Sequence, residues 1–200
     1  MANTAAYNGF QQYSGTGSAP TYEQVAVQIA YNASAIFQGD PVNPDANGYV
    51  VVGVTTTNAS ANTQIAGIFV GCQYLSVSQK RTVWSNYWPG SDVASTNVVT
   101  GYIINDPNAK FVAQFGNVSV TQSYVNTVVG FNIGTGNTAN GISGAYLATL
   151  GTTGTYDNTF PFRVISLVVD PPGVNGTESG AYQKAIVGFN FVQTKALVGI

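Results

Sequence analysis

The feature that most constrains the fold is a series of short apolar runs, each bounded by turn residues. In residues 24–29, Val25, Val27 and Ile29 occupy every second position, and this period of two favours a β-strand. Further runs rich in β-branched or aromatic residues, bounded by Gly, Pro, Asn or Asp, lie at residues 35–42, 49–55, 64–75, 98–104, 110–115, 124–131, 160–169 and 182–193. The pattern therefore predicts many short strands.

The residues between these runs match specific turn types. Asp106-Pro107-Asn108 suits a type I turn, Asn47-Gly48 supplies the positive φ of a hairpin turn, and Pro171-Pro172-Gly173 ends a strand. We find no long amphipathic helix to connect parallel strands and no fixed-period repeat. The predicted fold class is all-β, an antiparallel β-sandwich or barrel, jelly-roll-like, with an extended N-terminal arm.

The predicted arm spans residues 1–22, and residues 23–200 are expected to form a single β domain. Gly, Ser and Pro surround four isolated aromatic residues in the arm, and no regular period runs through it. The four aromatic residues are Tyr7, Phe10, Tyr13 and Tyr22. Such a segment is expected to be mobile in isolation and to become ordered on a partner, although an ordinary frayed terminus is the alternative.

The composition argues against catalysis. Only six basic and eight acidic side chains occur in 200 residues, with no histidine and one cysteine. Serine triads and cysteine dyads of the common kind need a histidine, and metal sites need clustered ligands. We therefore expect no enzymatic activity, no catalytic residues, no cofactor and no metal site. The formal net charge of −2 also gives no basic surface for nucleic acid.

The sequence context of individual polar residues favours structural roles over catalytic or metal-binding ones. Cys72 ends an apolar stretch, which indicates a buried and inert thiol. Four aspartates, none of them within a dense acidic loop, are expected to cap turns rather than to bind calcium. These are Asp40, Asp45, Asp92 and Asp106.

A second group of aromatic residues, Trp84, Tyr87 and Trp88, lies close to Lys80 and Arg81 in the sequence. Three interpretations stay open: an aromatic platform for sugar rings, anchors of a protein interface, or packing at the core or in a loop. The low charge favours assembly into a larger structure, because a surface of amides, hydroxyls and tyrosines packs readily against protein. An extracellular β domain with an uncharged polar coat is the alternative.

The first seven residues lack the basic start and apolar run of a secretory signal, and no run is long enough to span a bilayer. We expect a soluble protein that is not exported by that route and has no membrane partner.

Several blocks occur in an order that is typical of one family. Near the end, residues 160–170 form an apolar strand with Phe160-Pro161, a loop contains Asn175-Gly176, and residues 181–190 form a last strand ending at Asn190. The earlier blocks are Asn8-Gly9-Phe10, Ser18-Ala19-Pro20, residues 35–42, residues 66–71, residues 102–107 with Phe111, and residues 141–144. In their order and spacing, the chain resembles the capsid cement (decoration) proteins of short-tailed bacteriophages.

This resemblance implies a non-enzymatic protein that binds the outer surface of the major capsid protein lattice and stabilises the icosahedral head. It would be made in the cytoplasm of the bacterial host, bind as a homo-oligomer (dimer or trimer), and reside on the outer capsid surface of the virion. Seven aromatic residues are then the expected contacts with the capsid or a sister subunit: Tyr7, Phe10, Tyr13, Tyr22, Trp84, Tyr87 and Trp88. The alternatives are a carbohydrate-binding β-sandwich module or another virion component of the tail or neck.

Overall fold

The computed structural model describes residues 3–14, 24–54, 64–148, 160–169 and 180–195. Its regular structure consists of β-strands and two short 3-10 turns, η1 (Gln122–Tyr124) and η2 (Gln193–Lys195). Every pairing between named strands is antiparallel. The predicted all-β antiparallel fold class is therefore confirmed. No helix in the described ranges is long and apolar enough to cross a membrane.

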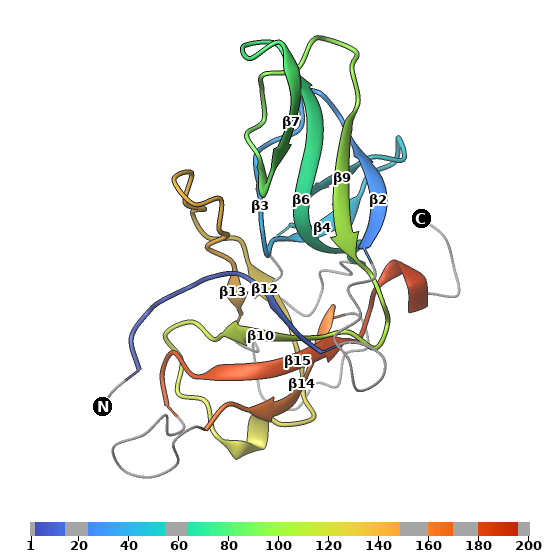
Figure 1. Cartoon of the computed structure of the whole chain (residues 1–200). Coiled ribbons are helices and arrows are strands. Elements are labelled where there is room, and N and C mark those ends of the chain that lie inside the picture. Colours follow the sequence, from blue (N-terminus) through green and yellow to red (C-terminus); the bar gives the residue numbers. More distant parts are fainter. Residues whose placement is uncertain (1–2, 15–23, 55–63, 149–159, 170–179, 196–200) are drawn as a thin grey trace.

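One half of the molecule is built on a five-stranded sheet, the lower half in Figure 1. Its strand order is β1 (Gln11–Ser14), β10 (Lys110–Gln114), β15 (Lys184–Phe189), β14 (Phe162–Leu167) and β11 (Val128–Val129). In β15 the buried residues Ala185, Val187 and Phe189 alternate with more exposed ones. This period of two places one face of the sheet on the core.

The other half is built on a six-stranded sheet, which stands above the first in Figure 1. Its order is β2 (Gln24–Ile29), β9 (Val99–Ile104), β6 (Gly67–Ser76), β4 (Pro41–Pro44) and β5 (Val50–Val52), and β7 (Arg81–Ser85) also pairs with β6. The strands at its two ends, β2 and β5, approach each other, so the sheet curls around its own interior. Two short strand pairs complete the structure: β3 (Ile36–Phe37) with β8 (Tyr87–Trp88), and β12 (Phe131–Asn132) with β13 (Tyr146–Leu147).

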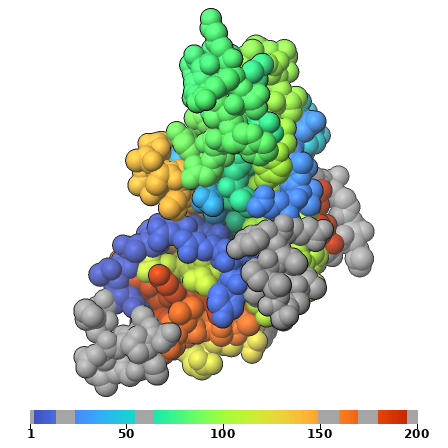
Figure 2. Space-filling view, in the orientation of Figure 1, coloured from blue at the N-terminus to red at the C-terminus, as the bar shows by residue number. Residues whose placement is uncertain are grey.

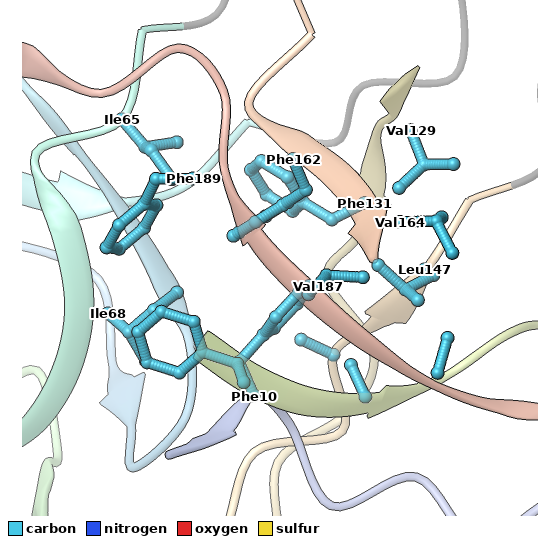
Figure 3. Close-up of a cluster of buried hydrophobic side chains, with 14 of the residues drawn as sticks. Phe10, Ile65, Ile68, Val129, Phe131, Leu147, Phe162, Val164, Val187 and Phe189 are labelled. Carbon is cyan, nitrogen blue, oxygen red and sulfur yellow. The ribbon is translucent and has the colours of Figure 1, made fainter. Parts of the chain in front are cut away.

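Each half has its own buried cluster of apolar side chains. Figure 3 shows the cluster of the five-stranded half, in which phenylalanine rings from distant segments meet. Phe162 stacks on Phe10 at a centroid distance of 4.4 Å and lies 5.9 Å from Phe189. Ile68 and Ile104 reach this cluster from β6 and β9, so the six-stranded sheet also contributes to it. Full burial of one such side chain is worth about 1.5–3 kcal/mol.

The second cluster fills the curled six-stranded sheet. It contains Phe69, Cys72 and Tyr74 from β6, Trp88 from β8 and Ile103 from β9. In β9, Val99, Gly101 and Ile103 are buried, while Thr100 and Tyr102 are only partly so. The alternation explains why the predicted strand at residues 98–104 has one inward and one outward face.

Residues 3–14 run in an extended course along the β body, which differs from the expected arm that becomes ordered only on a partner. Phe10 is 2% exposed within the first cluster, and its N–H donates to the Gly39 carbonyl at 2.9 Å. Buried Gln114 holds the preceding residues, since its Oε1 accepts from the Ala6 N–H at 2.8 Å and its Nε2 donates to the Thr4 carbonyl at 2.9 Å. Figure 2 shows these residues (blue) lying across the body.

The reason for this docking is a close approach that the sequence pattern did not reveal. Gly9 has a φ of 68°, and a Cβ at this position would lie 2.8 Å from the Ser143 Cβ and 2.9 Å from the Gly39 oxygen. Glycine therefore lets the chain turn Phe10 into the core at this point. The rest of the predicted arm, residues 15–22 with Tyr22, lies outside the described residues.

Candidate functional site

The aromatic residues of the N-terminal segment divide into buried and exposed ones. Tyr7 stacks on Tyr146 with ring centroids 4.3 Å apart, and Phe10 belongs to the core. Both are therefore engaged within the chain, and Phe10 has no surface left to offer a partner. Tyr13 is 57% exposed.

Tyr13 lies on β1, the last strand on its side of the five-stranded sheet. One edge of β1 pairs with β10, with a shift in register between Gln12 and Ser14. No strand within the described ranges pairs with its other edge. An outer strand with an exposed tyrosine is a surface on which another chain can add a strand.

The predicted cluster of Trp84, Tyr87 and Trp88 is not brought together. Trp88 is fully buried, its indole N–H donates to the Ala33 carbonyl at 3.2 Å, and it packs edge-on against Tyr74. Tyr87 is half-buried and stacks on Phe37 at 5.3 Å. Trp88 therefore packs in the core, one of the three interpretations left open, and has no surface to offer a partner, whereas a partner contact of Tyr87 stays a prediction.

Trp84 instead lies on the outer face of the six-stranded sheet and is 67% exposed. It stacks on Tyr102 of β9, with ring centroids 5.6 Å apart and planes inclined by 14°. The Tyr102 hydroxyl donates to Gln73 Oε1 at 3.4 Å. Gly71 is the register partner of Tyr102 on the intervening strand β6, so no side chain separates the two rings there. Tyr102 was missed because only the strand register brings it to Trp84.

An open groove of about 280 Å³ adjoins this aromatic pair. It is lined by Gln24, Val70, Gly71, Cys72, Trp84, Ser85, Asn86 and Tyr102. None of these lining residues is Asp, Glu, Lys or Arg, and the polar ones offer the amides of Gln24 and Asn86 and the hydroxyls of Ser85 and Tyr102. The groove and the exposed ring of Trp84 are together called the aromatic face below.

A second cavity of about 300 Å³ lies where the N-terminal segment meets the six-stranded sheet. Its lining combines amide side chains, among them Gln12, Gln24 and Gln38, with apolar ones such as Phe69 and Ile104. Gln12 Oε1 is buried there without a hydrogen-bond partner. A buried amide oxygen of this kind is ordinarily satisfied by water, which the volume accommodates.

The titratable residues serve the fold. Burial raises the pKa of Cys72 to about 12, and the predicted burial of this thiol is confirmed. Burial also raises the pKa of Asp40, against the opposing effect of hydrogen bonds from the Ser143 hydroxyl and the Phe37 N–H.

The turn-capping roles predicted for the aspartates are confirmed as well. Asp106 accepts from the Asn108 N–H at 2.9 Å, and Asp92 accepts from the Ser78 N–H at 2.8 Å.

In the described ranges, no three acidic or cysteine side chains are grouped as metal ligands. Comparison of the whole chain with protein-family models, with curated proteins and with solved structures found no match.

Proposed function

We propose that this protein is a phage capsid cement protein, which binds the outer surface of the major capsid protein lattice and stabilises the icosahedral head. The observation that supports this most is Tyr13, an exposed aromatic residue on the open edge strand of the β body. Tyrosine is enriched at the centres of protein interfaces, and edge strands pair with strands of other chains. The resemblance in block order to cement proteins supports the same function.

The surface composition of the molecule suits a structural role. Its described surface leaves large apolar side chains exposed on both halves, among them Leu75 at 54% and Val169 at 40%. Charge is sparse, since the whole chain has only fourteen Asp, Glu, Lys and Arg side chains. Such a surface packs against protein without the cost of desolvating many charges.

Stabilisation of the shell then follows from mass action. A protein that binds the assembled lattice, and not the separated capsid subunits, stabilises the lattice by RT ln(1 + c/Kd) per binding site, where c is its free concentration. As a dimer or trimer it makes its second attachment at a high effective concentration, so weak individual contacts hold neighbouring capsomers together. We propose such an oligomer for the bound state.

Co-sedimentation of the purified protein with heads that lack it tests this function. Wild-type protein is expected to bind saturably, and Tyr13→Ala to bind at least about tenfold more weakly, a loss of about 1.4 kcal/mol. Tyr31→Ala is the matched control, because Tyr31 is also an exposed tyrosine (40%) but follows β2 in the other half. Its binding is expected to equal that of the wild type.

Absence of wild-type binding would contradict the cement function itself. Equal binding by wild type and Tyr13→Ala would retain the function and move the contact away from the β1 edge.

A further inference from the structure

The aromatic face on the six-stranded sheet has features of a ligand site that the cement function leaves unused. We infer that it binds a neutral pyranose sugar, with the exposed ring of Trp84 as the stacking platform. The ligand class is an oligosaccharide of glucose or N-acetylglucosamine type, whose rings present axial hydrogens on flat faces. This inference is independent of the proposed cement function, because the Tyr13 edge belongs to the other sheet.

The first argument is the exposure of a fixed aromatic plane. Trp84 is 67% exposed although it is the bulkiest type of apolar side chain. It is supported on its inner side by Tyr102, which Gln73 fixes by a hydrogen bond at 3.4 Å. A supported ring loses little conformational freedom when a ligand binds, so stacking on it is favourable. The flat, apolar face of a pyranose fits such a plane.

The second argument is the polar chemistry next to the ring. Gln24, Ser85 and Asn86 line the adjoining groove. The Asn86 side chain is anchored by donation to the Asn140 carbonyl, and Ser85 Oγ accepts from the Tyr87 N–H at 3.2 Å. Amides and hydroxyls both donate and accept, as sugar hydroxyls do, so positioned groups of this kind can exchange hydrogen bonds with them.

The third argument concerns charge. The residues that line the groove are uncharged. Arg81 begins β7, on the same strand as Trp84, but its guanidinium donates to Gln79 Oε1 at 2.8 Å and 3.0 Å. An acidic sugar or a phosphate would have no cation to pair with in the groove, whereas a neutral sugar would leave no charge uncompensated. The groove volume of about 280 Å³ suits one or two sugar rings.

Tryptophan fluorescence offers a direct test, because the chain has two tryptophans and Trp88 is fully buried. A sugar that stacks on Trp84 is expected to shift and change the intensity of its emission. The intact protein would be titrated with cellohexaose and, separately, with chitohexaose, and binding would be measured in parallel by calorimetry. We expect a saturable change with at least one of these sugars and a Kd in the millimolar range or below.

The variant Trp84→Ala should weaken binding measured by calorimetry at least about tenfold. Leu75→Ala is the matched control, since Leu75 is 54% exposed on the same sheet but does not line the groove. It should bind as the wild type does. Circular dichroism should show both variants folded, because each removes an exposed side chain.

Three results would overturn the inference. One is unchanged wild-type emission and no heat of binding with either sugar at about 10 mM, well above a millimolar Kd. Another is sugar binding that survives Trp84→Ala. The third is loss of head binding in Trp84→Ala without any sugar binding by the wild type, which would make this face a protein contact and leave the cement function standing.

Discussion

Replacement of Phe10 by alanine tests whether the N-terminal segment is part of the folded body. Phe10 is 2% exposed, stacks on Phe162 at 4.4 Å and meets Phe131 edge-on at 6.5 Å. Truncation of a buried phenylalanine removes its transfer free energy and leaves a cavity, at a cost of about 3–5 kcal/mol. For a chain of this length, each 1 kcal/mol lowers Tm by about 2–4 °C, so Tm should fall by about 6–20 °C.

The matched control is Tyr13→Ala, three residues further along the same segment. Because Tyr13 is 57% exposed, its removal should change the free energy of unfolding by no more than about 0.5 kcal/mol. Urea denaturation followed by circular dichroism measures both variants. Equal midpoints for Phe10→Ala and the wild type would refute the docking of this segment and restore the expectation of a mobile arm.

Three further results are expected of the purified protein. The raised pKa of Asp40 means that the folded state binds a proton more readily than the unfolded state, so this residue makes the protein more stable as pH falls from neutral towards about 4. Asp40→Asn should remove this component, and parallel pH profiles of Tm for variant and wild type would contradict it. Because the pKa of Cys72 is about 12, a thiol reagent at pH 8 should label it only after unfolding, and rapid labelling of native protein would exclude that environment. Gly9→Ala should lower Tm, since its Cβ would lie 2.8 Å from the Ser143 Cβ at a positive φ, and an unchanged Tm would show that this approach is not required.

Local patterns predicted the strands well where both the period of two and the flanking turns were present. The runs at residues 24–29, 98–104 and 110–115 correspond to β2, β9 and β10. In the turns, Gly48 has a φ of 81° and the Ala109 N–H donates to the Asp106 carbonyl at 2.9 Å, as expected. These features depend on neighbouring residues alone, so the sequence contains them directly.

The candidate contacts depended on tertiary structure and were harder to predict. Trp84 and Trp88 are four residues apart and would share one face of a continuous strand. The chain bends at Asn86 instead, where it leaves its pairing with β6 and begins pairing with β3. One tryptophan therefore becomes exposed and the other buried, and the stack of Trp84 on Tyr102 arises from a pairing of strands that are distant in sequence.

The same holds for the N-terminal segment. Its aromatic residues follow no period, and this suggested an arm that needs a partner to become ordered. The segment is ordered by its own chain, because Gln114 and Gly39 supply hydrogen bonds from other elements and Phe162 supplies a stacking surface. Of the described aromatic residues in this segment, Tyr13 on the edge strand is the most exposed and is available to another molecule.

The most direct measurement of the cement function is the temperature at which heads release their DNA. Heads that lack the protein would be heated with a DNA-binding dye, alone and with increasing amounts of the purified protein. We expect the release temperature to rise with protein and to level off at saturation, with the largest rise at low salt, where repulsion between packaged phosphates is least screened. A release temperature that stays the same at saturating protein would contradict the account.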